Sequence, residues 1–526
     1  MKNRFSFLVF FLIVQSCKTE INKIGQEGTE IQTGKVHIID NTSETFSKKL
    51  LAVSLQGIIN QREARIYLLD RDRGINRPWE QSEARDFWLN YYKENKKIEI
   101  VWQGKLDEAL KIFATEINGY ILASESEPWT INAATTLSGL KKGLIVTEND
   151  LNIVEGFKML EDLRGRWKSA EECYFDMFEK IYSQTNQNML GIITPKEHNL
   201  RDFLIQRKIF TLYAKPQTPD WDTVKQILNK TRINIPVFGY MSDTGIEEYF
   251  AVETLSREGK YLIPSDTTPN LSFHSTVKSS KLTGGTTLPS PSSRSSWCED
   301  GKIYVTVAIS DGDNLAIPLN VYISSTNWLS SDRGKFPMGW SISPYLSRIA
   351  PSVAEYYLNT ATENDELVGM LGIGYVHPSF YPDMEFFVRE SLKYLYSMGM
   401  KVWWTLDPAL LSQNNPTWDK ISKYIDKNLE GFLVGYFGTK EEKYFRISSG
   451  QPVILANTTY SDTATSIGRF LREQANSIKT NTYRILFISA SVWSNSFQDL
   501  YNQLSELNEN RKIIFAMPSQ ILKCVP

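Results

Sequence analysis

Two aspartates and an asparagine stand together in the segment Ser310-Asp311-Gly312-Asp313-Asn314, directly after an apolar run. Carboxylates and an amide at this spacing could exchange a proton with a substrate, hold a metal ion or bond the hydroxyl groups of a sugar. The same residues also suit a turn in which an aspartate caps the following helix. The segment is therefore a candidate site, and its chemistry depends on what the fold places around it.

The segment follows the first of eight strand-like runs between residue 302 and the C-terminus. The runs are 303–310, 338–343, 367–375, 401–407, 431–437, 451–457, 483–491 and 512–518. Their continuous Val, Ile, Leu and Phe character is typical of parallel strands buried on both faces. Nearly every gap has room for a helix, so we predict an α/β fold with a C-terminal (β/α)8 TIM-barrel-like domain over 301–526. An open doubly wound sheet is the alternative.

Polar and aromatic side chains gather near the predicted carboxyl ends of these strands, where the loops of a barrel build its pocket. Aromatic rings can stack on sugar faces, while acids and amides bond hydroxyl groups, so the set is typical of a glycan pocket. The predicted substrate-binding residues are Asn314, Trp340, Tyr375, His377, Trp404, Tyr436, Asn457 and Trp493. A tryptophan inside a strand, such as Trp404, can equally be a core residue.

Hydrolysis of a glycosidic bond needs two carboxyl groups, one of which is kept protonated by its surroundings. Asp311 and Asp407 follow strands on opposite sides of the predicted barrel, which favours the wide spacing of an inverting enzyme. Asp313 could replace either of them. The predicted catalytic residues are therefore Asp311, Asp313 and Asp407, with Glu441 and Glu442 in reserve.

The region before the barrel, 36–274, alternates strand-like and helix-like segments and predicts a layered α/β region, subdivided near residues 105 and 186. Residues 275–300 are rich in Ser, Thr, Gly and Pro and predict a linker or long loop. If the N-terminal region covers the barrel mouth, an acidic residue of the segment 246–257 could reach the site. The candidates are Glu247, Glu248 and Glu253.

The N-terminus carries Lys2 and Arg4 followed by the apolar run 5–14, which is the order of a secretory signal. The run leads to Ser16-Cys17, which resembles a bacterial lipobox, so we predict a lipoprotein signal peptide over 1–16, acylation of Cys17 and a tether over 17–35. The protein is then exported and lipid-anchored in the cell envelope, with the outer membrane as the expected location and its face undecided. The lipid anchor is the only membrane contact we expect.

Composition narrows the remaining chemistry. With 58 basic and 60 acidic residues the chain has no basic excess, which disfavours nucleic-acid binding. Four histidines and four cysteines occur without a zinc-binding spacing, and no G-x-S-x-G motif is present. We expect no cofactor and no metal ligands, although an aspartate-only site for a hard ion such as calcium stays open. At most one disulfide is available among Cys173, Cys298 and Cys524 once Cys17 is acylated.

The run Gly372-Ile373-Gly374-Tyr375-Val376-His377-Pro378 resembles the signature that names the GxGYxYP family of proposed glycoside hydrolases, which are exported proteins of carbohydrate-degrading gut bacteria. One position departs from the signature, because His377 stands where the family has its second tyrosine. The segments 55–60, 201–204 and 310–314 are similar to the family as well. This resemblance covers nearly the whole mature chain and implies a multi-part N-terminal region, a barrel-like C-terminal domain and a proposed hydrolase activity.

Together these features predict a lipid-anchored glycoside hydrolase that acts on a polysaccharide or other glycan at the cell envelope. A non-catalytic glycan-binding lipoprotein with the same pocket is the alternative. A metal-dependent polysaccharide deacetylase is a third hypothesis, but it needs histidine ligands and the C-terminal domain contains only His377.

Overall fold

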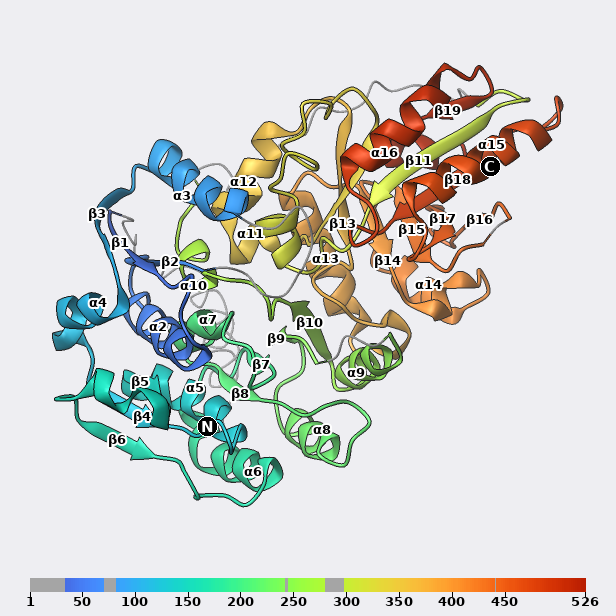
Figure 1. The fold of residues 1–526 in the computed structure, drawn as a ribbon. Helices are drawn as coiled ribbons and strands as arrows, with labels where there is room; N and C mark the ends of the chain where they lie inside the picture. Colours follow the sequence, from blue (N-terminus) through green and yellow to red (C-terminus); the bar gives the residue numbers. More distant parts are fainter. Residues whose placement is uncertain (1–33, 71–81, 242–244, 280–297, 440) are drawn as a thin grey trace, which may run out of the picture.

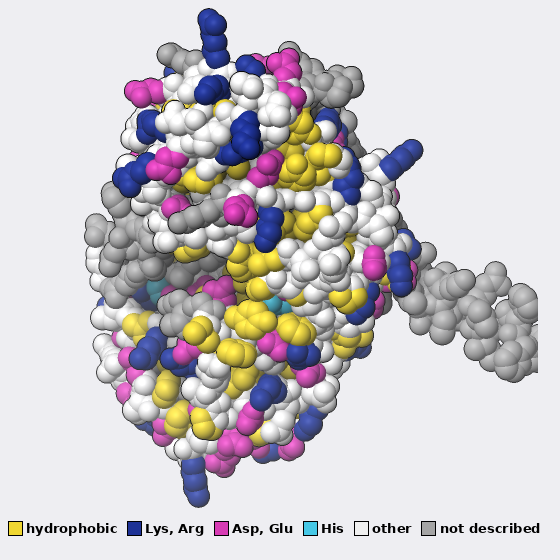
Figure 2. Space-filling model, turned by 90° about the vertical axis from the view of Figure 1, so that its right-hand side faces the viewer, with side chains coloured by type: hydrophobic (Ala, Val, Ile, Leu, Met, Phe, Trp, Pro, Cys, Tyr) yellow, Lys and Arg dark blue, Asp and Glu magenta, His cyan; other side chains and the backbone are white. Residues whose placement is uncertain are grey.

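The computed structural model describes residues 34–70, 82–241, 245–279, 298–439 and 441–526 (Figure 1). The predicted signal peptide, Cys17 and most of the tether and linker lie outside these ranges. No helix in the described ranges combines the length and the apolar character that crossing a membrane requires. On the face drawn in Figure 2, basic and acidic side chains are interspersed, in line with the formal net charge of −2.

Three small parallel sheets make up the N-terminal region, each with helices on its faces. The first has the order β2-β1-β3, the second β5-β4-β6 and the third β10-β9-β7-β8. The first unit contains β1 (Lys35–Asp40), α2 (Phe46–Ile59), β2 (Ile66–Leu69), α3 (Ser82–Lys96), β3 (Glu99–Gly104) and α4 (Leu106–Phe113). The second contains β4 (Gly119–Leu122), α5 (Trp129–Lys141), β5 (Gly143–Val146), β6 (Met159–Asp162) and α6 (Ala170–Ile181).

The third unit contains β7 (Leu190–Ile192), α7 (Arg201–Gln206), β8 (Phe210–Leu212), α8 (Trp221–Asn229), β9 (Ile235–Gly239), α9 (Gly245–Arg257), β10 (Lys260–Pro264) and α10 (Leu271–His274). Its strands are short and fully buried, as expected of parallel strands covered on both faces. In Figure 1 this unit, drawn in green, lies between the second unit and the C-terminal region, while α3 of the first unit contacts the C-terminal region directly.

The C-terminal region is a parallel barrel with helices around it. Its strands are β11 (Ile303–Ile309), β12 (Met338–Ile342), β13 (Asp365–Met370), β14 (Val402–Thr405), β15 (Gly431–Tyr436), β17 (Pro452–Thr459), β18 (Arg484–Ala490) and β19 (Ile513–Phe515), with β16 (Tyr444–Arg446) antiparallel to β17. The helices are α11 (Leu346–Ile349), α12 (Pro351–Thr360), α13 (Met384–Ser397), α14 (Pro416–Ser422), α15 (Ala464–Ser477), α16 (Phe497–Leu504) and α17 (Pro518–Leu522).

The closed ring has seven strands rather than the eight that we predicted. All eight predicted runs form strands, but β11 pairs with two neighbours on one side. Residues 303–305 of β11 pair with β19, and only Ala308 and Ile309 pair with β12, which closes the ring. Because β12 begins alongside the last residues of β11, the first half of β11 is left for the three-residue β19.

The third unit is joined to the barrel through its edge strand. Leu262 of β10 forms an antiparallel bridge with Tyr375, with backbone N–H···O distances of 3.1 and 2.7 Å in the two directions. The Leu315 N–H donates to the Pro264 carbonyl at 2.9 Å. One apolar cluster continues from Phe238 of the third unit into the barrel core. The edge of the third sheet is therefore covered by the barrel itself, and the two parts form one continuous structure.

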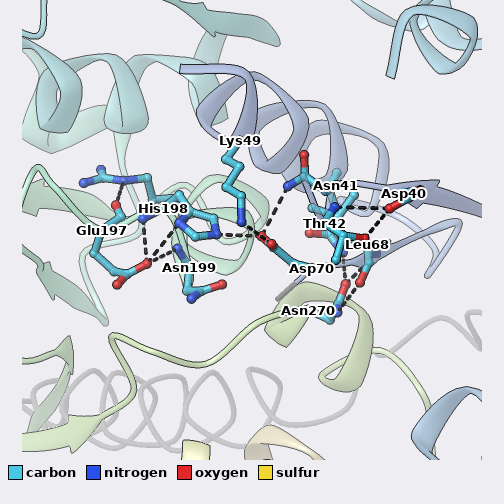
Figure 3. Close-up of polar contacts among 12 residues, drawn as sticks. Asp40, Asn41, Thr42, Lys49, Leu68, Asp70, Glu197, His198, Asn199 and Asn270 are labelled. Carbon is cyan, nitrogen blue, oxygen red and sulfur yellow. Dashed lines mark hydrogen bonds and ion pairs between the residues drawn. The ribbon is translucent and has the colours of Figure 1, made fainter. Parts of the chain in front are cut away.

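A buried charged cluster ties the first unit to the third (Figure 3). Lys49 of α2 forms an ion pair with Asp70, and His198 Nε2 lies 2.6 Å from the other oxygen of the same carboxylate. The three side chains are 1%, 4% and 6% exposed. Burial opposes the charge on Asp70, but the hydrogen bonds and charges of His198 and Lys49 outweigh it, so the pKa of Asp70 is lowered.

We expect Lys49→Met to lower the free energy of unfolding by about 3–5 kcal/mol near neutral pH, because it leaves the Asp70 carboxylate buried with one partner fewer. Since the pKa of Asp70 is lowered in the folded state, its contribution is present above the pKa of the unfolded chain and is lost as the pH falls through the folded value. The loss of stability caused by Lys49→Met should therefore become smaller as the pH falls through the folded-state pKa of Asp70.

Chemical denaturation at several pH values measures both effects. Lys48→Met is the matched control, because Lys48 is partly exposed and forms an ion pair with Glu44, which precedes α2. Equal denaturation curves for Lys49→Met and the wild type would show that the cluster does not hold the two units together.

Candidate active site

Asp311 connects the ends of four barrel strands. It follows β11 with a left-handed backbone (φ +70°), and its carboxylate accepts hydrogen bonds from three side chains. The Tyr436 hydroxyl donates to Oδ1 at 2.6 Å, and the Tyr460 hydroxyl donates to Oδ2 at 2.8 Å. The Trp493 indole N–H donates to Oδ2 as well. Because both oxygens receive donors, the carboxyl group acts purely as an acceptor.

Asp313 lies beside Asp311 and is almost fully buried, with 8% of the residue exposed. Burial, followed by the charges of Asp311 and Glu248, raises the pKa of Asp313 well above its usual value. Gly312 allows this arrangement, since a Cβ there would lie 1.7 Å from the Ser341 carbonyl oxygen at the end of β12. The segment therefore places a protonated carboxyl next to an acceptor-only carboxylate.

A third carboxyl group, on the third N-terminal unit, acts electrostatically on Asp313. Glu248 lies in the first turn of α9, and its Oε2 accepts a hydrogen bond from the Tyr240 hydroxyl at 2.5 Å. It also hydrogen-bonds Tyr375. Burial and the charge of Glu248, with smaller contributions from Asp313 and Asp311, raise the pKa of Tyr375, so its phenol keeps its proton. This position agrees with the expectation that an acidic residue of this segment reaches the barrel mouth.

The Gly-x-Gly-Tyr run makes the contact between the two parts possible. Gly372 has a φ of +65°, and a Cβ there would lie 2.4 Å from the Ser391 hydroxyl oxygen. A Cβ on Gly374 would lie 2.7 Å from the Leu262 carbonyl oxygen. Both glycines are therefore required by close packing, and they allow Tyr375 to pair with β10.

His377 lies behind Tyr375 rather than among the carboxylates. Its ring stacks on Tyr375 at 6.0 Å and meets the Tyr249 ring edge-on at 4.6 Å, and neither ring nitrogen has a hydrogen-bond partner. Burial lowers the pKa of His377, although Asp407 and Glu253 act in the opposite direction. The imidazole is therefore held between aromatic rings in a largely enclosed position.

Asp407 lies apart from the cluster around Asp311. It is 1% exposed, and its carboxylate accepts the backbone N–H groups of Ser379 at 2.8 Å and Ala409 at 2.9 Å. It thus caps the short helix η6 (Pro408–Leu411) and holds the loop that follows His377, whose Nδ1 is 4.0 Å away. Both of its oxygens are engaged by the backbone.

Four other predicted residues are engaged in packing or in backbone contacts. Trp340 is fully buried against Tyr322 and Trp328, with its N–H donating to Asp365 at 2.9 Å. Trp404 is fully buried beneath Tyr436, with the two ring centroids 5.7 Å apart.

The two predicted amides also serve the backbone. Asn314 accepts the Ala316 N–H at 3.0 Å, and Asn457 accepts the Phe487 N–H at 2.9 Å. Of the predicted residues, the structure therefore brings together Asp311, Asp313, Tyr375, Tyr436 and Trp493.

The sequence pattern missed Tyr240 and Tyr460. Tyr460 is 41% exposed while its hydroxyl is bound to Asp311, so its ring faces solvent at the mouth of the barrel. We ended the sixth strand at residue 457, but β17 continues to Thr459, so Tyr460 follows the true strand end. Tyr240 directly follows the apolar strand β9, and the same strand-end rule would have found it.

Within the described ranges, no three His, Cys, Asp or Glu side chains are grouped so that they could hold a metal ion. One disulfide joins Cys298, just before β11, to Cys524 near the C-terminus, and Cys173 is a buried free thiol.

Comparison with protein families gives four matches along the chain. Residues 35–115 match the "GxGYxYP_N 1st domain", 117–185 the "GxGYxYP_N second domain" and 179–276 the "GxGYxYP third domain". Residues 301–523 match the "GxGYxYP putative glycoside hydrolase C-terminal domain". No curated protein matches the chain.

A solved structure described as a "putative hydrolase from Bacteroides thetaiotaomicron" is similar in fold. Its TM-score is 0.78 at 21% sequence identity, and the alignment covers 94% of this chain and 95% of that one. The similarity extends over the N-terminal units as well as the barrel.

We expect Gly374→Ala to lower the free energy of unfolding by roughly 1–3 kcal/mol, because the added methyl group would overlap the Leu262 carbonyl oxygen and part β10 from Tyr375. Thermal melting measures the loss. Gly34→Ala is the control, since no atom of the described residues lies within 4 Å of its added Cβ. Identical melting temperatures for the Gly374→Ala variant and the wild type would mean that this contact does not require a glycine.

Proposed function

Because the chain belongs to the GxGYxYP family, we propose that it is a glycoside hydrolase that cleaves its substrate with carboxyl groups at the barrel mouth. The observation that carries this proposal is the pair formed by Asp313 and Asp311. Glycosidases use one carboxyl group as a proton donor and a second as a charged partner, and their surroundings separate the two pKa values. Asp313 is buried beside two carboxylates, whereas three donors surround the Asp311 carboxylate.

In this proposal Asp313 donates its proton to the glycosidic oxygen as the bond to the anomeric carbon breaks. The Asp311 carboxylate stabilises the positive charge that develops on the sugar ring. Tyr436, Tyr460 and Trp493 hold Asp311 in place, so it need not reorganise during the reaction.

The substrate is a glycan in this proposal. Tyr460 offers an exposed aromatic ring directly beside Asp311, which suits stacking on a sugar face. The charged groups that raise the pKa of Asp313, Tyr375 and Tyr436 are all carboxylates. We therefore infer a neutral or cationic sugar at the cleavage point, because an anionic sugar would be repelled there.

For the location, we propose export and acylation of Cys17, which anchors the protein in the cell envelope. The charged and apolar order of residues 2–14 supports this, and so does the Cys298–Cys524 disulfide, since disulfides persist in oxidising compartments. Mass spectrometry of the mature N-terminus tests it, and an unmodified Cys17 in the mature protein would contradict it.

We expect Asp313→Asn to lower kcat/KM by about 100-fold or more, because it removes the proton donor. The raised pKa also predicts that wild-type activity falls only as the pH rises through a value well above that of an ordinary carboxyl group. The substitution should change stability in the opposite direction from activity. A carboxyl with a raised folded pKa loses stability as the pH rises, so the variant should gain stability relative to the wild type at higher pH.

Hydrolysis of a panel of aryl glycosides and oligosaccharides, followed across pH, measures these effects. Asp419→Asn, an exposed position on α14, is the control and should behave as the wild type. If the wild type binds a glycan of the panel but releases no product, the protein is a glycan-binding protein and the proposed hydrolysis is wrong.

Two substitutions at Tyr460 separate its two contacts. Tyr460→Phe removes the hydroxyl group, and with it the hydrogen bond to Asp311, but keeps the ring, and it should lower kcat about tenfold with little change in KM. Tyr460→Ala also removes the exposed ring and should in addition raise KM for oligosaccharides about tenfold. If both variants lower kcat equally and leave KM unchanged, the ring does not bind substrate.

A further inference from the structure

Helix α9 is fixed over the barrel mouth from several sides. The backbone N–H of His377 donates to Ser256 Oγ at 2.9 Å, and the Arg257 guanidinium lies 3.9 Å from the centre of the Phe380 ring. The bridge between Leu262 and Tyr375 holds the strand that follows the helix. In Figure 1, α9 lies beside β10, on the side of the third unit that faces the barrel. Side chains in the first turn of α9 are therefore held in a defined position.

Two successive glutamates in that turn have different surroundings. Glu247 forms an ion pair with Lys215, 2.9 Å away on the third unit itself. Glu248 instead hydrogen-bonds the hydroxyl groups of Tyr240 and Tyr375. One of these tyrosines belongs to the third unit and the other to the barrel, so Glu248 is positioned from both sides of the contact.

A purely structural tie between the two parts would not require a carboxylate at this position. The charge on Glu248 acts on Asp313, which is already repelled by Asp311, and like charges in a buried site are unfavourable. A neutral glutamine could accept the same phenolic hydrogen bonds without that repulsion. A carboxyl group at position 248 therefore points to a chemical role.

We propose that Glu248 is a catalytic residue, the general base that takes the proton from the attacking water, so that the third N-terminal unit completes the active site. This inference rests on the proposed glycoside hydrolase function. Asp311 lies on the barrel beside Asp313, and three barrel side chains hold both of its oxygens, which suits it to stabilising charge on the sugar ring. Glu248 is bound by phenols that keep their protons, and it reaches the site from the opposite part of the molecule.

The reaction that follows is a single displacement. The water oxygen forms a bond to the anomeric carbon while one water proton passes to the Glu248 carboxylate. The bond between the anomeric carbon and the glycosidic oxygen breaks, and that oxygen takes the proton of Asp313. Solvent then returns a proton from Glu248 to Asp313. The products are a sugar with a free anomeric hydroxyl group and the alcohol that carries the former glycosidic oxygen. The configuration at the anomeric carbon is inverted.

The test compares Glu248→Gln, Glu248→Ala and Glu247→Gln in the full chain. We expect Glu248→Gln to lower kcat on aryl glycosides by about 100-fold or more, because glutamine keeps the phenolic contacts but accepts no proton. Glu247→Gln should retain wild-type activity. Sodium azide should restore turnover of a glycosyl fluoride by Glu248→Ala and give a glycosyl azide of inverted configuration. Proton NMR of wild-type hydrolysis should likewise show an inverted first product.

The outcomes separate this inference from the proposed function. If the wild type hydrolyses its substrate and Glu248→Gln keeps activity within about threefold, Glu248 is not the base while the hydrolase function stands. A wild-type product of retained configuration also overturns the inference, as does the absence of azide rescue in a Glu248→Ala variant that melts as the wild type does. Absence of hydrolysis by the wild type on the whole panel overturns the proposed function and this inference together.

Discussion

The backbone bridge between Leu262 and Tyr375 is the contact on which the candidate site depends. It joins the edge strand of the third N-terminal sheet to the loop after β13, and it forms only because Gly374 lets the two backbones approach. Through this bridge, α9 is held over the barrel mouth and Glu248 meets Tyr375. The glycines of the family signature are therefore required by packing, and the signature acts on the site through the contact that it makes possible.

The electrostatics of the site depend on the third unit covering the barrel mouth. Covering the mouth buries Asp313, and a buried carboxyl beside two carboxylates keeps its proton rather than adding a third charge. Phenols and an indole N–H supply the compensating contacts, and the electrostatic neighbours of Asp313 are acidic. Such a cluster is unfavourable for folding, and the apolar core shared by the barrel and the third unit supplies the compensating stability.

Much of the fold could be predicted from the sequence, because parallel strands buried on both faces appear as continuous apolar runs. All eight C-terminal runs are strands, yet the closure of the ring depends on the stagger between β11 and β12, which hydrophobicity does not encode.

The strand-end rule also found Asp311 and Asp313. It could not distinguish them from Asp407, because a strand-end aspartate can equally face the mouth or cap the next helix. Asp407 takes the capping position, since its carboxylate accepts the backbone N–H groups of Ser379 and Ala409. Glu248 is distant in sequence from the barrel, and no pattern in the sequence favours it over Glu247 or Glu253.

In the proposed reaction, a glycosidic bond is positioned between Asp313 on the barrel and the third N-terminal unit. The most direct measurement is a crystal structure of an inactive full-length Asp313→Asn variant with an uncleaved oligosaccharide bound. We predict that the glycosidic oxygen lies within hydrogen-bonding distance of the Asn side chain at position 313, with a sugar ring against Tyr460. An oligosaccharide bound elsewhere, with the side chain at position 313 covered only by protein atoms, would contradict the account.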